Sequence, residues 1–275
     1  MSGKLYLVAT PIGNLEDITL RAIRILKEVD IIAAEDTRHS LKLLNHLEIS
    51  KPLISYHRHN EDIKTDGLIE KILNGENIAL ITDAGTPAIS DPGEIIVKKA
   101  IENNIEIIPI PGACALINAL ITSGFDTKEF SFYGFLPLNK KLRNNKFAEL
   151  IKEKKTIIIY EAPHKIENTL NDIYKNLGDV NIVLARELTK IHESFIRGKV
   201  SEVIEKVKEI KGEMIILIEG NKNQEEEKNE EILSIEEQYE KYKKSGLSKN
   251  EIIKKIAKNN GVNKNEIYMK LLDKK

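Results

Sequence analysis

The sequence predicts an α/β protein made of two α/β domains followed by a small helical tail. Short β-branched segments alternate with segments of helical period from Lys4 to Ile110, as in "KLYLVAT", "ITLRAIRILKEV" and "DIIAA". This alternation is typical of βαβ units and of a mostly parallel sheet. A second alternating series follows from "FSFYGFLP" to "EMIILIEG". Its segment "ESFIRGKV" looks like the arm of a hairpin, so the second sheet should be mixed.

The first domain is expected to cover residues 1–114. Runs of β-branched and other apolar residues predict strands over 4–10, 30–34, 52–55, 77–82 and 105–110. Segments in which apolar residues recur every three or four positions predict helices over 18–29, 40–47, 66–75 and 93–104. The order of these elements predicts an open sheet with helical connections.

The second domain is expected to cover residues 115–221. Its predicted strands are 130–137, 156–162, 181–187, 194–200 and 213–220, and its predicted helices are a Lys- and Asn-rich segment ending near 154 and the segment 165–177. Two α/β domains that face each other leave a cleft between them, which is a common place for a ligand.

The chain changes character after Gly220. Residues 222–240 contain eight Glu and two Lys, whereas residues 241–275 contain eleven Lys and three acidic residues, a net of +8. We therefore expect an acidic linker over 222–234 and a basic helix-turn-helix over 235–275, with helix-start pairs Ser248/Glu251 and Asn263/Glu266. Two interpretations stay open: the tail contacts nucleic acid, or it is a Lys-rich helical pair that docks on its own chain.

The composition is that of a globular protein without an overall electrostatic bias. Of 275 residues, 41% are hydrophobic and 31% are charged, and the formal net charge is −1. The single cysteine, Cys114, excludes a disulfide framework and suits a reducing compartment. No apolar signal core and no apolar run of about 18 residues is present, so we expect a cytoplasmic protein that contacts no membrane.

Three irregular segments follow predicted strands of the first domain: "TPIGN", "EDTRHS" and "DAGTPAISDPG". In open α/β sheets the loops at the carboxyl ends of the strands form the binding crevice. None of them is a G-x-G-x-x-G or G-x-x-x-x-G-K-[ST] motif, so dinucleotide or triphosphate binding has no direct support. Glycines and small residues in these loops instead predict a pocket in which backbone groups approach a flat ligand.

Seven segments together resemble the ribosomal RNA small subunit methyltransferase I group of the tetrapyrrole methylase superfamily: "VATPIGNLEDITLRA", "AAEDTRHS", "ITDAGTPAISDPG", "PIPGACAL", "FYGFLP", "YEAPHK" and "ARELTK". The resemblance covers about the first 220 residues, and the basic tail is similar to that group's terminal helices. It implies a homodimeric enzyme that binds S-adenosylmethionine between its two domains. The implied reaction is methylation of a cytidine ribose 2′-hydroxyl in the decoding region of small-subunit (16S) ribosomal RNA.

The resemblance also implies a set of cofactor-binding residues. These are Pro11, Ile12, Gly13, Gly85, Thr86, Ile89, Cys114, Ala115, Tyr160, Glu213 and Met214. Relatives that act on tetrapyrroles have Gly-Asp-Pro where this chain has Gly85-Thr86-Pro87. A carboxylate is therefore missing at that point of the turn.

A neutral hydroxyl is a poor nucleophile, so the implied reaction benefits from a proton acceptor or from a group that stabilises the alkoxide. The candidates for this catalytic role are Glu35, Asp36, Arg38, Lys165, Arg186 and Glu187, with His39, His57 and His59 as further possible acceptors. Each has a structural alternative. Glu35, Asp36 and Arg38 are also the charged residues expected at the start of a helix that Thr37 caps. Arg186 and Glu187 could form a structural ion pair. Lys165 could simply begin a helix. No metal site is expected.

Ribosomal RNA as partner requires local positive charge, because phosphate contacts dominate affinity. The candidates are Arg38, Arg58, Lys140, Lys141, Arg143 and the tail lysines, and Tyr56, Tyr133 and Phe135 are candidate stacking platforms. Two other functions stay open. One is methylation of a small tetrapyrrole, and the other is a non-catalytic ribosome-assembly protein with a vestigial cofactor site.

Overall fold

A computed structural model describes residues 2–207, 212–220, 234–245, 247–260 and 262–272. The chain forms two compact units, residues 1–221 and residues 222–275. The first unit contains two five-stranded sheets with helices packed on them, and the described residues of the second unit form helices α9 to α11. The predicted α/β class is confirmed. No helix within the described ranges is both long and apolar enough to cross a membrane.

The first sheet has the strand order β3-β2-β4-β1-β5, and all its neighbours are parallel. Its strands are β1 (Lys4–Val8), β2 (Ile31–Ala34), β3 (Leu53–Ser55), β4 (Ile78–Ile81) and β5 (Glu106–Ile110). Leu5 on the inner strand β1 lies opposite Ile78 of β4 and Ile107 of β5. Each strand lies within one that the sequence predicts.

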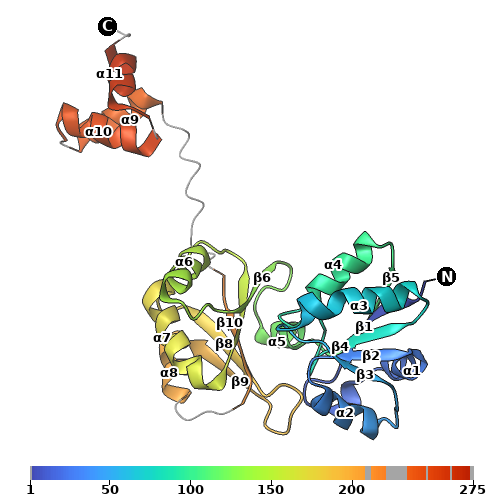
Figure 1. Cartoon of the computed structure of the whole chain (residues 1–275). Coiled ribbons are helices and arrows are strands. Elements are labelled where there is room, and N and C mark those ends of the chain that lie inside the picture. Colours follow the sequence, from blue (N-terminus) through green and yellow to red (C-terminus); the bar gives the residue numbers. More distant parts are fainter. Residues whose placement is uncertain (1, 208–211, 221–233, 246, 261, 273–275) are drawn as a thin grey trace. The chain divides into compact units, whose positions relative to one another are not determined.

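Helices cover both faces of this sheet (Figure 1). The helices α1 (Leu20–Glu28) and α2 (Thr37–His46) share a buried cluster with Ile32 and Ala34, whereas α3 (Glu61–Leu73) and α4 (Glu94–Glu102) share one with Ile31 and Ala33. Successive residues of a strand point to opposite faces, so these runs are apolar on both sides. The parallel sheet is therefore the middle layer of three.

The crevice of this sheet lies at the carboxyl ends of β1 and β4, which are neighbours. The chain leaves β1 for α1 on one face and leaves β4 for α4 on the other face. Connections that diverge in this way leave a space at the sheet edge, which is where open α/β folds bind ligands. The loops after the two strands are joined there by a backbone bridge between Thr10 and Gly85.

The second sheet has the order β6-β7-β10-β8-β9. Its strands are β6 (Phe130–Phe135), β7 (Thr156–Glu161), β8 (Asn181–Arg186), β9 (Ser194–Lys199) and β10 (Met214–Ile218). Only the β6–β7 pair is parallel, and β8 and β9 form an antiparallel pair. The predicted mixed sheet and its hairpin are confirmed.

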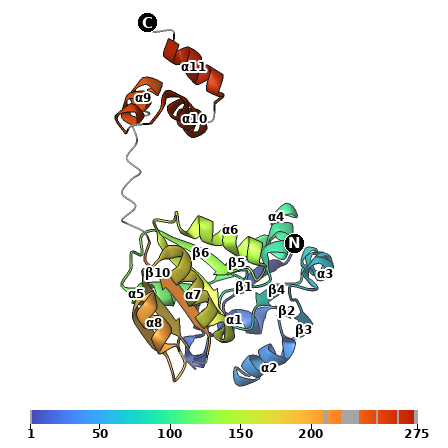
Figure 2. The ribbon, with the colours of Figure 1, turned by 90° about the vertical axis from the view of Figure 1, so that its left-hand side faces the viewer.

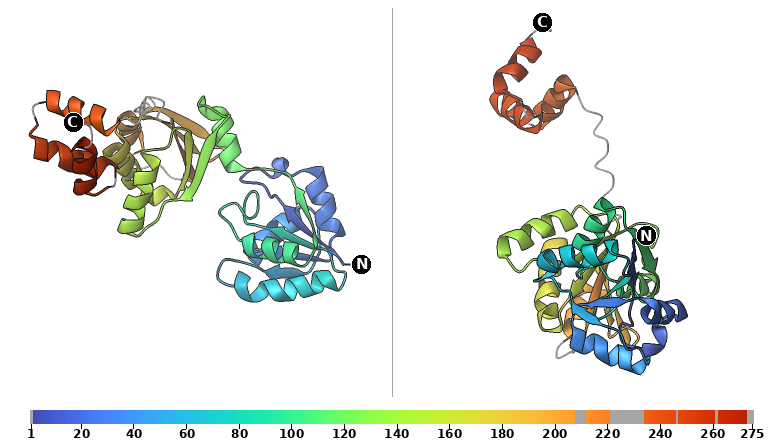
Figure 3. Two further views of the ribbon diagram at one scale, coloured as in Figure 1. Left: turned by 90° about the horizontal axis from the view of Figure 1, so that it is seen from above. Right: turned by 45° about the vertical axis from the view of Figure 1, so that its right-hand side comes forward.

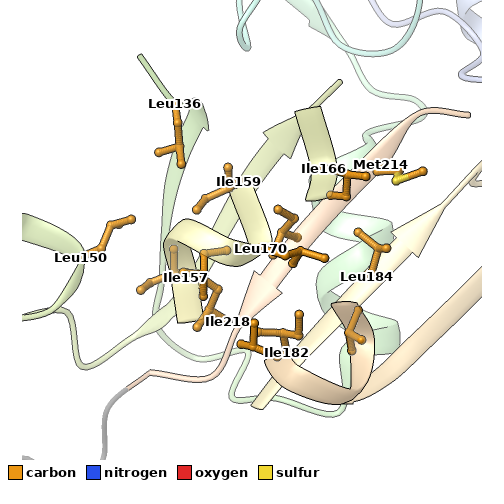
Figure 4. Packing of buried hydrophobic residues seen from close by; sticks show 14 of the residues in the cluster. Leu136, Leu150, Ile157, Ile159, Ile166, Leu170, Ile182, Leu184, Met214 and Ile218 are labelled. Atoms are coloured by element: carbon orange, nitrogen blue, oxygen red, sulfur yellow. The ribbon is translucent and has the colours of Figure 1, made fainter. Parts of the chain in front are cut away.

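Helices α6 (Lys140–Leu150), α7 (Ile166–Leu177) and α8 (Val200–Lys206) cover one face of the second sheet (Figure 2). Figure 4 shows their core, in which Leu170 lies among Ile159, Ile182 and other side chains of the strands. Helix α5 (Ala115–Ser123) packs on the other face and lies between the two sheets (Figure 3). Ile12 of the first sheet's loops joins the α5 cluster, so an apolar contact links the sheets.

The unit of residues 222–275 contains α9 (Ile235–Lys244), α10 (Lys249–Asn260) and α11 (Lys264–Leu272). Ile252, Ile256 and Ile267 are buried between them. Ser248 donates from its N and Oγ to Glu251 at the start of α10, at 3.0 and 2.6 Å. The tail thus contains three described helices where the sequence pattern indicated two. The predicted acidic linker lies outside the described residues, apart from Ser234.

Burial in the central strand β10 should determine the stability of the second sheet. Ile216 is fully buried, so Ile216→Ala should lower the free energy of unfolding by about 2–5 kcal/mol in urea denaturation. Ile63→Ala is the control, because that side chain is 80% exposed and its removal should change the value by less than about 0.5 kcal/mol. Equal losses in both variants would contradict the burial assigned to β10.

Candidate functional site

A cavity of about 350 Å³ lies between the loops of the first sheet and the face of the second sheet. Ile12, Gly85 and Cys114 line it from the first sheet's loops, and Tyr160 and Met214 line it from β7 and β10. Its volume is that of a small-molecule site, and mostly apolar walls with few polar groups are typical of such sites.

The loop after β4 forms one wall through its backbone. Thr10 N donates to Gly85 O at 2.9 Å and Gly85 N donates to Thr10 O at 3.0 Å. Gly85 has a φ of +86°, and a Cβ built there would lie 3.1 Å from Ile12 Cγ2. A side chain at this position would therefore be strained by the backbone conformation and crowded by Ile12. Ala88 and Ser90 also have positive φ angles of 65°, and such strain concentrates at functional sites.

Aromatic rings form the opposite wall. The Tyr160 ring contacts Phe132 and Phe135 edge-on, with centroids 4.9 and 5.7 Å apart. Burial is the main cause of a raised Tyr160 pKa, with a further contribution from Cys114, so the phenol is neutral at physiological pH. Phe135 is 58% exposed although it lines the cavity, so it lies at the rim.

A half-buried carboxylate, Asp91, adds charge to the wall. Its pKa is raised to about 6, mainly by burial and also by the neighbouring charges of Glu35 and Asp83, while Arg58 opposes the shift. Burial also raises the pKa of Glu35. Arg58 Nη2 donates to Ser90 O at 2.5 Å and so fixes the turn that carries Asp91.

The bulge in β6 allows this turn to approach the second sheet. The register with β7 shifts between Phe132 and Gly134, and Gly134 has a φ of +59°. A Cβ at Gly134 would lie 3.1 Å from Ser90 Oγ. The missing side chain thus lets the turn at Ser90 close one side of the cavity against β6.

Residues 4–204 match the family model described as Tetrapyrrole (Corrin/Porphyrin) Methylases. The chain belongs to this family. The matched residues include the first sheet and strands β6 to β9 of the second sheet, with the cavity residues up to Leu188.

Within the family the chain is 49% identical to "Ribosomal RNA small subunit methyltransferase I" of Halalkalibacterium halodurans, over 93% of this chain and 90% of the relative. It is 48% identical to the protein of that name from Bacillus subtilis, over 93% and 89%. The predicted resemblance to that group is confirmed. Uroporphyrin-III C-methyltransferase from Thermus thermophilus, solved with S-adenosylhomocysteine, shares the fold with a TM-score of 0.57 at 17% identity, over 78% of this chain and 97% of that one.

The structure places most of the predicted cofactor residues of this methylase fold on the cavity wall. Those that line it are Ile12, Gly85, Thr86, Ile89, Cys114, Ala115, Tyr160, Glu213 and Met214. Thr86 Oγ1 donates to Ala113 O at 3.1 Å, which ties the loop after β4 to the loop after β5. Pro11 and Gly13 do not line the cavity. A Cβ at Gly13 would lie 2.4 Å from Lys190 Cγ, so this glycine serves packing between loops.

None of the six predicted catalytic residues lines the cavity. Asp36 accepts from Arg38 N at 2.9 Å and pairs with the Arg38 guanidinium at 2.7 Å. The hydrogen bond from Arg38 holds the Asp36 pKa well below its usual range. Asp36 is also the N-cap of α2, so the expectation that Thr37 caps this helix was wrong. Glu35 turns instead toward the Asp83 N, 3.4 Å away.

The other three candidates lie beside the wall. Lys165 lies at the start of α7, and Arg186 ends β8 opposite Met214. Glu187 Oε1 accepts from Glu213 N at 2.8 Å and from Lys190 Nζ at 3.1 Å. It thereby holds the start of β10, which carries two wall residues. Their catalytic roles stay predictions, and the geometry of Glu187 is that of a positioning residue.

Sequence reasoning missed two acids of the wall, Asp91 and Glu161. Asp91 stands in the quoted "AISDPG" and Glu161 in "YEAPHK", so both were within recognised segments. Their position depends on the strained turn and on the pairing of β7, which no local pattern reports.

The histidine candidates do not form part of the wall either. The rings of His57 and His59 lie edge-on with centroids 6.1 Å apart. Within the described residues, no group of three His, Cys, Asp or Glu side chains is arranged to hold a metal ion.

The Glu187 interactions should stabilise the fold in a pH-dependent way. Burial raises the Glu187 pKa, but the hydrogen bonds from Glu213 N and Lys190 outweigh it and the pKa lies below its ordinary value of 4.5. Glu187→Gln should lower the free energy of unfolding by about 1 kcal/mol at pH 7. The loss should be complete above pH 4.5 and shrink as the pH falls through the lower folded-state pKa.

Urea denaturation of both proteins at several pH values measures this difference. Glu102→Gln, at an exposed position of α4, is the matched control and should show no such pH-dependent loss. A loss in Glu187→Gln that is unchanged at pH 3 would contradict the role of the Glu187 charge.

Proposed function

We propose that this chain transfers the methyl group of S-adenosylmethionine to the ribose 2′-hydroxyl of a cytidine in the decoding region of small-subunit (16S) ribosomal RNA. The names of the relatives support an RNA of the small subunit as substrate. The assignment of cytidine as the target nucleoside and of the 2′-oxygen as the acceptor is based on the resemblance. The labelling experiment below tests both assignments.

The cavity suits S-adenosylmethionine. Its volume of about 350 Å³ lies in the range of small-molecule sites, and the backbone of Gly85 and the small residues Cys114 and Ala115 leave room for a flat ring. Glu213 and the aromatic wall around Tyr160 suit the cationic parts of such a ligand. When bound, this cofactor supplies a methyl group on a positively charged sulfur. The protein's task is to orient the acceptor oxygen and to exclude water.

The basic helical unit is the feature that favours RNA over a small tetrapyrrole as the substrate. A groove in this unit is lined by Lys254, Lys255 and Lys264, with Glu251 as the acid on its wall. Phosphate binding uses such lysines, whereas a small substrate of the cavity has no evident use for them. The relatives align over 93% of this chain, which extends beyond the methylase match that ends at residue 204.

Burial and pairing reduce the number of residues in the first unit that could contact RNA. Arg143 is paired with Asp172 at 2.7 Å and is 16% exposed, so it holds α6 to α7. Tyr56 is fully buried and bonded to Thr65, so it is no stacking platform. Lys140 and Lys141 are exposed, and Phe135 lies at the cavity rim. These three residues lie on or next to β6 and α6. We therefore expect the target nucleotide to enter from that side.

The homodimer and the cytoplasmic location also remain proposals. The first rests on the family resemblance, and the second rests on the composition and the lone cysteine.

The reaction is tested by supplying labelled S-adenosylmethionine with small ribosomal subunits purified from cells that lack this protein. Mass spectrometry of the nucleosides should find the label in 2′-O-methylcytidine. Transfer to a tetrapyrrole precursor in place of RNA would favour the small-molecule alternative. Cofactor binding with no transfer to either would favour a non-catalytic assembly protein.

The role of the basic groove is tested on the full chain. Lys254→Ala combined with Lys264→Ala should weaken binding to small-subunit ribosomal RNA and reduce the slope of log affinity against log salt by about 0.7–0.9 per lysine. Lys243→Ala is the control, because Lys243 lies on α9 and pairs with Glu240 at 3.6 Å. An unchanged slope in the double variant would show that the unit docks elsewhere.

A further inference from the structure

We propose that the ring of Phe135 stacks on the base of the target nucleotide and holds its ribose at the entrance of the cavity. This inference rests on the proposed function and adds to it the residue that positions the acceptor. Phe135 ends β6, lines the cavity and is 58% exposed. A large aromatic side chain that is exposed at the edge of a ligand cavity presents ring surface to a flat partner.

The bulge in β6 directs Phe135 toward the cavity. Residues three positions apart on a regular strand point to opposite faces of the sheet. The register with β7 shifts between Phe132 and Gly134, however, and the extra residue changes this alternation. Phe132 and Phe135 therefore both contact the ring of Tyr160 edge-on. The bulge thus extends the aromatic wall of the cavity toward solvent.

The two other aromatic residues that the sequence suggested for stacking have different roles. Tyr56 is fully buried in the core of the first sheet. Tyr133 donates from its hydroxyl to Glu153 at 3.1 Å, and Lys146 Nζ lies 5.3 Å from the centroid of its ring. Of the three candidates, Phe135 is the one whose ring is both exposed and part of the cavity wall.

The segment that follows Phe135 has the composition of a surface that binds RNA. Leu138 and Leu142 are both more than half exposed. Lys140 and Lys141 open α6 and are exposed, and the first turn of this helix carries no acidic residue. Within the described ranges of the chain, no ion pair to either lysine is found. Bases stack on aromatic rings and phosphates bind lysines, so this surface suits an unpaired nucleotide.

The proposed reaction requires a contact of this kind. A nucleotide must leave the base stack of its RNA before an enzyme cavity can receive it, and this step costs free energy. Stacking on a protein ring offsets that cost. Phe135 shares the cavity with Gly85 and Tyr160, two of the predicted cofactor residues. A base held on the Phe135 ring therefore keeps its ribose close to the methyl donor.

Three variants of the full chain test the stack in the methylation assay on small ribosomal subunits. Phe135→Ala removes the ring, so kcat/KM should fall about 5- to 150-fold, the effect of losing one base–aromatic stack. Phe135→Tyr keeps a flat ring and should stay within about threefold of wild type. Phe135→Leu keeps an apolar side chain without a ring and should stay at least about fivefold below wild type. Full activity of Phe135→Leu would contradict the proposal, because leucine satisfies a role in apolar packing.

Phe130→Ala is the matched control for these variants. Phe130 lies at the other end of the same strand, is exposed and does not line the cavity. Its replacement should leave kcat/KM within about twofold of wild type. An equal loss in Phe130→Ala and Phe135→Ala would contradict the proposal, because it would show damage to β6 as a whole.

A cofactor titration decides whether Phe135 contacts the base or the cofactor. Calorimetry with S-adenosylhomocysteine should give an affinity for Phe135→Ala within about threefold of wild type, because the ring lies at the exposed rim. A loss of affinity as large as the loss of kcat/KM would overturn the proposal and make Phe135 a cofactor contact.

A contact measurement checks the same residue without relying on activity. Phe135→p-benzoylphenylalanine places a photoreactive ring at the rim, and irradiation with small subunits and S-adenosylhomocysteine should link it to ribosomal RNA. The linked nucleotide should be the one that carries the label in the methylation assay, or its direct neighbour. The same replacement at Phe130 should give no link to that nucleotide. A link only to a ribosomal protein, or only to RNA elsewhere, would overturn the proposal.

The outcomes separate this inference from the proposed function. A wild type that forms no 2′-O-methylcytidine would remove the proposed function and this inference with it. An active wild type whose Phe135→Ala variant is equally active would leave the proposed function intact and reject the role of Phe135 alone.

Discussion

The backbone bridge between Thr10 and Gly85 is the constraint on which the site depends. It joins the loops that follow β1 and β4, the two strands whose connections leave the first sheet on opposite faces. Because the bridge uses main-chain groups and a glycine with positive φ, the two loops approach without side chains between them. The remaining space is bounded by Ile12 and by the second sheet, and it becomes the cavity.

The apolar contact between the sheets follows from the same arrangement. Ile12 stands at the edge of the crevice and packs into the cluster formed by α5 and the second sheet, which includes Ile158 and Ile215. Burial of such side chains stabilises each by about 1.5–3 kcal/mol relative to exposure. Residues that line the site therefore also hold the two halves together. This double role explains why the walls are mostly apolar.

Charge is distributed unevenly in this protein. Near the cavity, carboxylates are brought close together, and burial raises the pKa of Glu35 and Asp91 at a cost to stability. Such shifts concentrate where chemistry occurs. The lysines of the last unit instead stand exposed around a groove, where they favour phosphate binding. A net charge of −1 for the whole chain conceals both features.

Local patterns in the sequence determined the order of strands and helices, the hairpin of β8 and β9, and the loops that surround the cavity. Strands such as "IIAA" and "MIILI" are apolar on both faces, so their burial in a covered sheet is fixed by local composition. Family-specific segments added the predicted cofactor residues, most of which lie on the wall. Pro11 and Gly13 lie in the same loop as Ile12 but do not line the wall. A loop has two sides, and the sequence alone does not show which residues face the cavity.

Only the tertiary structure decided which charged residues face the cavity. Asp36, Arg38 and Glu187 had the right chemistry, but Asp36 caps α2 and pairs with Arg38, and Glu187 holds the start of β10. Asp91 was hidden in a strained turn, and the charged groups that act on it come from the loops after β2, β3 and β4. The physical reason is the distance along the chain over which each effect acts. Periodicity and propensity act over a few residues, whereas the burial and the field that set a carboxylate's pKa depend on groups far apart in the chain.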